Sequence, residues 1–157
     1  MTSKSSARRS GSRRRPKELP PDLYARIKEL CDRGNEKCEE ERYREAIEDY
    51  EGALLLIPEP IEEWEAATWV LVALGDCCFL LGDFPAAHGY LSHAMVCPGA
   101  LGTPFIHLRL GEVQFELGNE ARAKDELARA YMGGGPEIFE SEDPKYLTYL
   151  RRFMRGI

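Results

Sequence analysis

The chain lacks any long run of apolar residues. Hydrophobic residues make up 43% of its 157 positions, yet no stretch of about 18 consecutive apolar residues occurs. We therefore exclude a membrane-spanning helix, and the apolar segment that marks a secretory signal is missing as well. A chain of this length is expected to fold as one domain around a continuous core.

Cysteine pairs in the Cys-x-x-Cys arrangement are also missing. The chain contains five cysteines, an odd number: Cys31, Cys38, Cys77, Cys78 and Cys97. The odd number and the missing signal favour a reducing, cytoplasmic setting, in which thiols serve as small core residues. The alternative is an unpaired cysteine that is open to oxidation.

The sequence shows no arrangement of residues typical of catalysis. No Ser-His-Asp or Cys-His set stands out, and residues 133–135 (three glycines) are not followed by the Lys-Ser/Thr of a phosphate-binding loop. His93 and Cys97 are four residues apart, but two ligands do not make a structural zinc site, which needs four. We therefore expect no enzyme, no catalytic residue, no metal and no cofactor.

Charge is distributed unevenly along the chain. The net charge is −6, but residues 1–17 contain seven Lys and Arg and no acid, so the remainder carries −13 (14 basic against 27 acidic). An acidic body argues against nucleic acid as the ligand of the folded part. Residues 1–20 are predicted to be a disordered basic tail and residues 21–157 the folded domain. Four interpretations of the tail stay open: an extension without a dedicated role, a targeting signal, a solubilising leader or a tether for nucleic acid.

Three small residues recur at a fixed spacing. A glycine is followed by an alanine 12 residues later and by a second alanine 7 residues after that. The three copies, which lie 41 and then 36 residues apart, are Gly34, Ala46 and Ala53, then Gly75, Ala87 and Ala94, and then Gly111, Ala123 and Ala130. A repeat of this length predicts a helical solenoid. Small residues would let paired helices approach closely, and a larger side chain there would cost about 1–3 kcal/mol by overpacking.

The apolar residues follow a helical period from residue 21 onward, and no segment resembles a strand. We expect helices over residues 22–39, 43–57, 61–81, 85–96, 103–117, 120–132 and 144–155. Pro58 ends the second of these, and Asp143 before Pro144 is a good N-cap for the last. The predicted units are hairpins over residues 25–58, 61–98 and 103–132, followed by a cap over residues 143–155.

The first copy resembles a tetratricopeptide repeat (TPR). Gly34, Ala46, Tyr50, Ala53 and Pro58 match that motif at the expected offsets, and the likeness extends over residues 25–132. The tryptophan usual in the first helix of the motif is absent from every copy. The resemblance implies an all-α, right-handed solenoid of three hairpins plus a C-terminal capping helix. It also implies a non-catalytic module that binds a protein or peptide in its concave groove.

The 41-residue step is seven residues longer than the usual repeat of about 34. Because the landmarks shift together, we place the extra residues between Ala53 and Gly75, in the segment 59–68. The third helix is therefore expected to begin two turns early. Trp64 would then either cover the neighbouring hairpin or serve as an exposed binding anchor.

The resemblance also assigns residues to the groove, which the first helix of each hairpin would line. Counted from the glycines, these residues are Lys28, Cys31, Asn35, Cys38, Trp69, Val72, Asp76, Phe79, Phe105, Leu108, Arg109, Glu112 and Phe115. The set is aromatic in the middle with added negative charge, so we expect a protein partner with apolar anchors and basic residues. The alternative is that several of the aromatic residues pack between repeats.

One TPR subclass binds C-terminal carboxylates with five groove residues, chiefly Lys and Asn with one Arg. Asn35 and Arg109 fall on two of these positions, but the other three hold Cys31, Ala73 and Phe105, which cannot supply the charge. We therefore do not expect the tails of chaperones to bind in this groove.

The closing segment, residues 131–154, resembles that of small bacterial repeat proteins found beside polymorphic toxin genes, for which an immunity role is proposed. Its residues Tyr146, Leu147, Leu150 and Phe153 form a stripe that can close the end of the solenoid. Two alternatives to a general binding module follow. One is a cytoplasmic immunity protein that neutralises a toxin, and the other is a nucleic-acid-associated factor that uses the basic tail.

Overall fold

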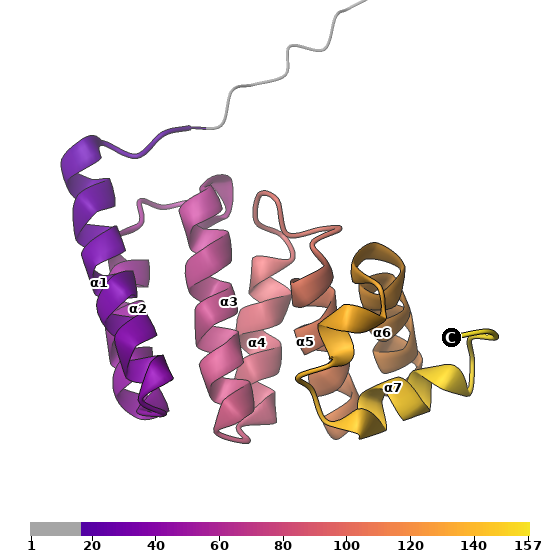
Figure 1. Cartoon of the computed structure of the whole chain (residues 1–157). Helices are drawn as coiled ribbons and strands as arrows, with labels where there is room; N and C mark the ends of the chain where they lie inside the picture. The colour runs from indigo at the N-terminus through magenta and orange to yellow at the C-terminus, as the bar shows by residue number, and fades with distance from the viewer. Residues whose placement is uncertain (1–16) are drawn as a thin grey trace, which may run out of the picture.

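The structure, a computed structural model, describes residues 17–157, so the predicted basic tail lies almost entirely outside the described residues. Residues 17–157 form seven α-helices and two short 3-10 helices, without a strand. In order they are α1 (Pro21–Glu39), α2 (Tyr43–Leu56), η1 (Ile61–Glu63), α3 (Glu65–Leu80), α4 (Phe84–Ala94), α5 (Pro104–Glu116), α6 (Glu120–Gly134), η2 (Pro136–Phe139) and α7 (Pro144–Arg151). Helices α1 to α6 form three hairpins that stack side by side (Figure 1). The predicted all-α solenoid with a capping helix is confirmed.

The two helices of each hairpin cross at a glycine. Each glycine of the repeated spacing lies against the side chain found 16 residues later, in the partner helix. A Cβ atom added to the glycine would lie 2.6 Å from Tyr50 Cε1 at Gly34, 2.6 Å from Leu91 Cγ at Gly75 and 2.8 Å from Leu127 Cγ at Gly111. Any side chain at these glycines would therefore push the paired helices apart.

The alanines of the repeated spacing lie in the second helix of each hairpin, α2, α4 or α6. All six have no exposed surface: Ala46, Ala53, Ala87, Ala94, Ala123 and Ala130. They belong to the buried clusters of the core, where a methyl group is the only side chain to be accommodated. The structural role predicted for these small residues is in keeping with this burial, because a larger side chain would overpack the core.

Buried apolar side chains connect the hairpins along the whole stack. The largest cluster lies between the first two hairpins and includes Ile27 and Leu71. A second cluster joins α4 to α5 through Leu91 and Val113. The third joins the last hairpin to the closing segment around Leu150. Each cluster thus connects neighbouring units, as in a solenoid. No helix of the described part is both long and apolar enough to span a bilayer.

The connection between the first and second hairpins differs from the prediction. Residues 61–63 form a single 3-10 turn, the backbone at Trp64 is extended (φ −113°, ψ 129°), and α3 begins only at Glu65. The indole N–H of Trp64 donates a hydrogen bond to the carbonyl oxygen of Pro58 at 2.8 Å, which folds the connection back on itself. The third helix therefore begins four residues later than the expected start at residue 61, and residues 59–64 of the extra segment form a loop with one 3-10 turn.

The last two helices also end elsewhere than expected. Helix α6 continues through Gly133 and Gly134 and ends where Gly135 adopts a left-handed φ of 72°. The missing side chain of Gly134 leaves room for Ile138, because an added Cβ would lie 2.7 Å from Ile138 Cγ2. Helix α7 ends at Arg151, four residues before the predicted end.

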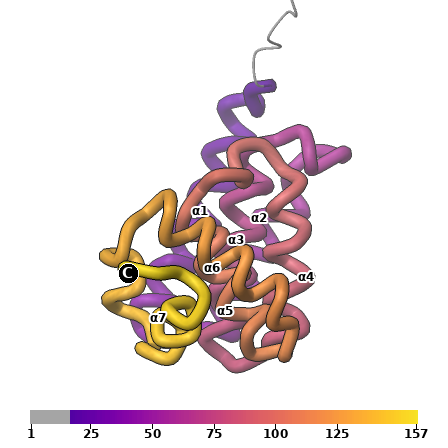
Figure 2. The backbone as a smooth tube through the Cα atoms, turned by 90° about the vertical axis from the view of Figure 1, so that its right-hand side faces the viewer, coloured from indigo at the N-terminus to yellow at the C-terminus, as the bar shows by residue number. Residues whose placement is uncertain are grey.

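The segment after α6 closes the C-terminal end of the stack. Figure 2, which faces this end, shows α7 near the viewer, beside α5 and α6. The ring of Phe115 packs edge-on against Tyr146 and Tyr149, with centroid distances of 5.4 and 5.1 Å. Asp143 accepts a hydrogen bond from the backbone N–H of Lys145 at 3.0 Å and so caps α7.

Candidate partner-binding groove

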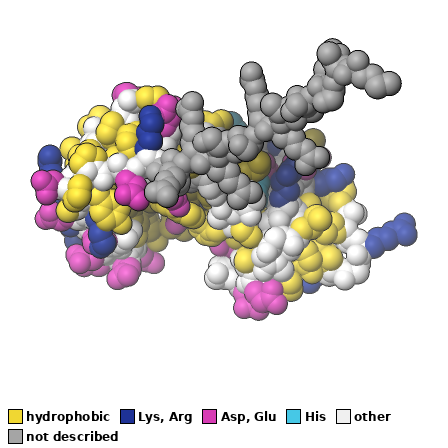
Figure 3. All heavy atoms as spheres, turned by 90° about the horizontal axis from the view of Figure 1, so that it is seen from above, with side chains coloured by type: hydrophobic (Ala, Val, Ile, Leu, Met, Phe, Trp, Pro, Cys, Tyr) yellow, Lys and Arg dark blue, Asp and Glu magenta, His cyan; other side chains and the backbone are white. Residues whose placement is uncertain are grey.

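The first helices of the three hairpins, α1, α3 and α5, lie on one side of the molecule. Side chains connect them in order: Cys38 of α1 contacts Cys77 of α3, and Asp76 of α3 pairs with Arg109 of α5. Seen from above, a recess separates the two ends of the molecule, and hydrophobic side chains are exposed on both sides of it (Figure 3). We call the side formed by α1, α3 and α5 the groove. It carries the residues that we predicted from the sequence to bind a partner.

Two aromatic side chains are exposed in the groove. Trp69 of α3 is 47% exposed and Phe105 of α5 is 39% exposed. Both lie six residues before the glycine of their repeat, so they occupy the same place on neighbouring hairpins. Lys28 has this place on α1, and Tyr24, one helical turn earlier, adds a third exposed ring. Each of the three hairpins thus exposes one aromatic side chain from its first helix.

The other predicted groove residues are less free to contact a partner. Lys28 is exposed but pairs with Asp32 at 2.7 Å, and Asn35 accepts a hydrogen bond from the Tyr50 hydroxyl at 2.6 Å. Half-buried side chains are Cys31, Cys38, Asp76, Phe79 and Phe115, and buried ones are Val72, Leu108, Arg109 and Glu112. The buried residues cannot contact a partner at the surface, so fewer residues line the accessible groove than the sequence predicted.

Arg109 is buried on the groove side, between α3, α5 and the loop before α7. Its guanidinium contacts three carboxylates, at 2.7 Å from Asp76, 3.1 Å from Glu112 and 2.9 Å from Glu142. Its central carbon also lies 4.3 Å from the ring centroid of Phe79 and 5.3 Å from that of Phe105. Because its charge is already compensated, Arg109 is not free to hold a carboxylate of a partner. This geometry supports the expectation that the groove does not clamp chaperone tails.

The carboxylates around Arg109 outnumber its positive charge. Burial raises the pKa of Glu112 to about 9; Arg109 acts to lower it, and the nearby Glu142 and Asp76 raise it further. Glu112 therefore keeps its proton at neutral pH. Burial also raises the pKa of Asp76, against the charge and hydrogen bond of Arg109. With Glu112 neutral, one arginine faces two carboxylates, and the site keeps an excess of negative charge.

Two residues of this surface were not among the predicted site residues. Glu142 lies in the loop between η2 and α7 and reaches Arg109 from there. A loop has no period that could be counted, so no signal in the sequence located it. Tyr24, in contrast, lies four residues before Lys28 on α1, and counting one turn back along the helix could have found it.

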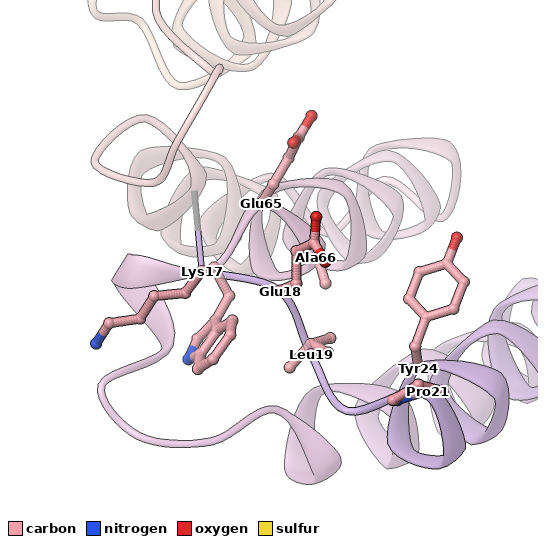
Figure 4. A pocket seen from close by; sticks show the side chains of 8 residues that line it. Lys17, Glu18, Leu19, Pro21, Tyr24, Glu65 and Ala66 are labelled. Atoms are coloured by element: carbon pink, nitrogen blue, oxygen red, sulfur yellow. The ribbon is translucent and has the colours of Figure 1, made fainter. Parts of the chain in front are cut away.

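A pocket of about 420 Å³ opens beside Tyr24, between the start of α1 and the start of α3 (Figure 4). Its lining consists of Lys17, Glu18, Leu19, Pro21, Tyr24, Trp64, Glu65 and Ala66. The Lys17 ammonium lies 5.9 Å from the centre of the Trp64 ring and also pairs with Glu63. Trp64 is half-buried and packs against the core of the first two hairpins. It therefore covers the neighbouring hairpin, one of its two predicted roles, and its ring also lines the pocket.

The residues considered for metal binding have other contacts. Residues 17–157 contain no group of three or more His, Cys, Asp or Glu side chains that could hold an ion. His93 Nε2 lies 2.7 Å from a carboxylate oxygen of Glu62. The thiol of the buried Cys97 donates to the carbonyl oxygen of His93 at 3.4 Å. Both side chains thus take part in ordinary packing and hydrogen bonding.

Comparison with known proteins finds solved structures of similar fold. No protein-family model and no curated protein matches the chain. A TPR-containing C-terminal domain from Plasmodium falciparum gives a TM-score of 0.67 at 17% identity, with 86% of this chain and 90% of that chain covered. The Yersinia enterocolitica type III secretion chaperone SycD, in complex with a peptide of the translocator YopD, gives 0.62 at 17% identity, with 80% and 90% covered. The first TPR of Spaghetti (RPAP3), bound to the HSP90 peptide SRMEEVD, gives 0.61 at 18% identity, with 82% and 90% covered.

At these identities the likeness concerns the fold. Two of the three structures contain a bound peptide, which is a property of those proteins. None of the three is described as a toxin or an immunity protein, so they lend no support to the immunity interpretation of the closing segment. The resemblance to tetratricopeptide repeats is confirmed at the level of the structure: the chain has the fold of the TPR proteins.

Proposed function

We propose that this chain is a non-catalytic interaction module that binds a partner protein or peptide in the groove of α1, α3 and α5. The observation that carries the proposal is the pair of exposed aromatic side chains, Trp69 and Phe105, at the same place on neighbouring hairpins. Aromatic side chains are enriched among the residues that dominate binding energy at interfaces. Solved structures of similar fold that contain bound peptides support a partner of this kind.

The chemistry of the groove favours a partner with apolar anchors next to basic residues. Trp69 and Phe105 expose aromatic surface against which an apolar side chain can pack. Close to them, the Asp76 side chain is 31% exposed and the Glu142 side chain 14% exposed, so a cation from solvent can reach Asp76 more easily. The charge of −13 on residues 18–157 would also steer a basic partner toward the folded body.

Affinity purification from the native cell, with the full chain as bait, identifies the partner. Calorimetry with the purified partner then tests this proposal. Trp69→Ala and Phe105→Ala should each weaken binding by about tenfold or more, as expected of anchor residues. Leu55→Ala and Met132→Ala are the matched controls, because they remove side chains that are 86% and 79% exposed on α2 and α6, away from the groove. The controls should bind like the wild type. If both groove variants also bind like the wild type, the groove assignment is wrong.

A further inference from the structure

Two of the five free cysteines meet at the boundary between the first two hairpins. The Sγ atoms of Cys38, in the last turn of α1, and Cys77, in α3, lie 3.1 Å apart. The two residues are 39 positions apart in the chain, so the stacking of the hairpins brings them together. All five cysteines lie in the described part of the chain and are free thiols there.

Side chains from three helices fix the distance between these thiols. Cys77 is 1% exposed in the largest core cluster, and the half-buried Cys38 packs against the same cluster. The hydroxyl of Tyr50, in α2, lies 3.6 Å from Cys38 Sγ. The same hydroxyl donates its hydrogen bond to Asn35, one of the residues assigned to the groove. The two sulfurs are therefore neighbours because of the core packing itself.

We propose that Cys38 and Cys77 are a site of reversible oxidation, where a disulfide joins the first hairpin to the second. The sulfurs need to approach by only about 1 Å, from 3.1 Å to a bonded distance of about 2.05 Å. The other three cysteines of the described part have no such contact with a second thiol. They are Cys31, Cys78 and Cys97. The assignment does not depend on the proposed function of the groove.

The oxidant is a small disulfide, such as oxidised glutathione. Cys38, the more accessible thiol, loses its proton to solvent, and its thiolate attacks one sulfur of the oxidant. The bond between the two glutathione sulfurs breaks, and the first glutathione leaves as a thiolate that takes up a proton. Cys77 then loses its proton and attacks the Cys38 sulfur, which releases the second glutathione in the same way. Two protein thiols are oxidised, and one glutathione disulfide is reduced to two thiols.

The environment of Cys77 determines how fast the second step proceeds. Burial raises the pKa of the Cys77 thiol, and the contact with Cys38 raises it further. Since the thiolate is the attacking species, we expect closure of the disulfide to accelerate as the pH rises. Dithiothreitol should reopen the bond more slowly than an exposed disulfide, because Cys77 is buried.

The disulfide would change how the first two hairpins are held together. Repeats of a solenoid are held by contacts with their neighbours, so a covalent bond between α1 and α3 fixes how the first hairpin leans on the second. Bond formation also moves the Cys38 sulfur, which contacts the Tyr50 hydroxyl that donates a hydrogen bond to Asn35. Oxidation in the core is thereby transmitted to a side chain of the groove.

The test uses the full chain, first reduced and then incubated with oxidised glutathione under native conditions. The remaining thiols are alkylated, and the protein is digested without reduction for mass spectrometry. We expect one cross-linked pair of peptides, containing Cys38 and Cys77, that dithiothreitol separates. Cys31→Ser is the matched control, because Cys31 is the other half-buried cysteine of α1. This variant should keep the cross-link, whereas Cys38→Ser should lose it.

A second measurement needs no variant. In the oxidised wild type, alkylation should spare Cys38 and Cys77 but still modify Cys31, and the thermal midpoint should rise above that of the reduced protein. Three results would overturn the proposal. Cys38 could be recovered only as a mixed disulfide with glutathione, it could be paired with another cysteine, or the cross-link could form only after unfolding in urea.

Discussion

Replacing Glu112 by glutamine should make the protein more stable relative to the wild type as the pH rises. Glu112 is fully buried, and burial raises its pKa to about 9, whereas its ordinary pKa in an unfolded chain is 4.5. Between these values the folded state binds a proton that the unfolded state does not. The stability that this group contributes is therefore fully present below pH 4.5 and is lost as the pH rises toward about 9. Glutamine does not ionise, so the stability of the variant lacks this dependence on pH.

The size of the effect follows from the pKa values. The distance from the ordinary pKa of 4.5 to about pH 7 is 2.5 units, and each unit corresponds to about 1.36 kcal/mol. Between these two pH values the variant should gain about 3 kcal/mol over the wild type. Glutamine also suits the site, because its carbonyl oxygen can accept the hydrogen bond that Arg109 donates to Glu112 at 3.1 Å. Urea unfolding of both proteins at a series of pH values measures the difference.

Glu116→Gln is the matched control, one turn further along α5. Partial burial acts to raise the pKa of Glu116, but hydrogen bonds from Lys145 and Tyr146 lower it below its ordinary value. Its contribution is present above the ordinary pKa and is lost as the pH falls through the lower folded value. Glu116→Gln should therefore destabilise the protein at neutral pH and less so in acid. A difference between wild type and Glu112→Gln that stays constant with pH would refute the raised pKa.

Two further substitutions, one of them with a matched control, probe the packing and the buried charges. Gly75→Ala should lower the free energy of unfolding by about 1–3 kcal/mol because the new Cβ meets Leu91, whereas Gly89→Ala, in open space on α4, should be neutral or raise it by up to about 1 kcal/mol. Urea unfolding measures both, and equal effects would contradict the close crossing of α3 and α4. Arg109→Met should cost about 3–5 kcal/mol at neutral pH because Asp76 and Glu142 lose their buried partner. Thermal unfolding followed by circular dichroism should show a smaller loss in acid, and an undiminished loss would assign the effect to packing.

The fold could be predicted from the sequence because its main contacts are local. Gly34 and Tyr50 belong to one hairpin, and they meet because the first helix ends five residues after the glycine and the second begins four residues later. The same count applies to the second and third hairpins, so three copies of one spacing were enough to indicate the stack. Counting from the same glycines also predicted that the first helix of each hairpin, α1, α3 or α5, lines one side of the stack.

The accessibility of the groove residues could not be predicted in this way. Leu108 and Glu112 have the register of groove positions, but the closing segment and the pairing with Arg109 bury them. The position of Glu142 depends on how a loop without periodicity packs back on α5. The neighbouring thiols of Cys38 and Cys77 depend on how two hairpins lean on each other, which the period within a hairpin does not specify.

Arg109 connects parts of the chain that a linear stack usually keeps separate. Its partner Asp76 belongs to the second hairpin, and its partner Glu142 belongs to the closing segment beyond the third. In a simple repeat array the ends can open alone, because stability is a sum of terms between neighbours. Here, opening the closing segment takes Glu142 away from Arg109, whose guanidinium is also paired with Asp76 of the second hairpin. From α3 to α7 the chain should therefore unfold as one cooperative block, and fraying should begin at the first hairpin.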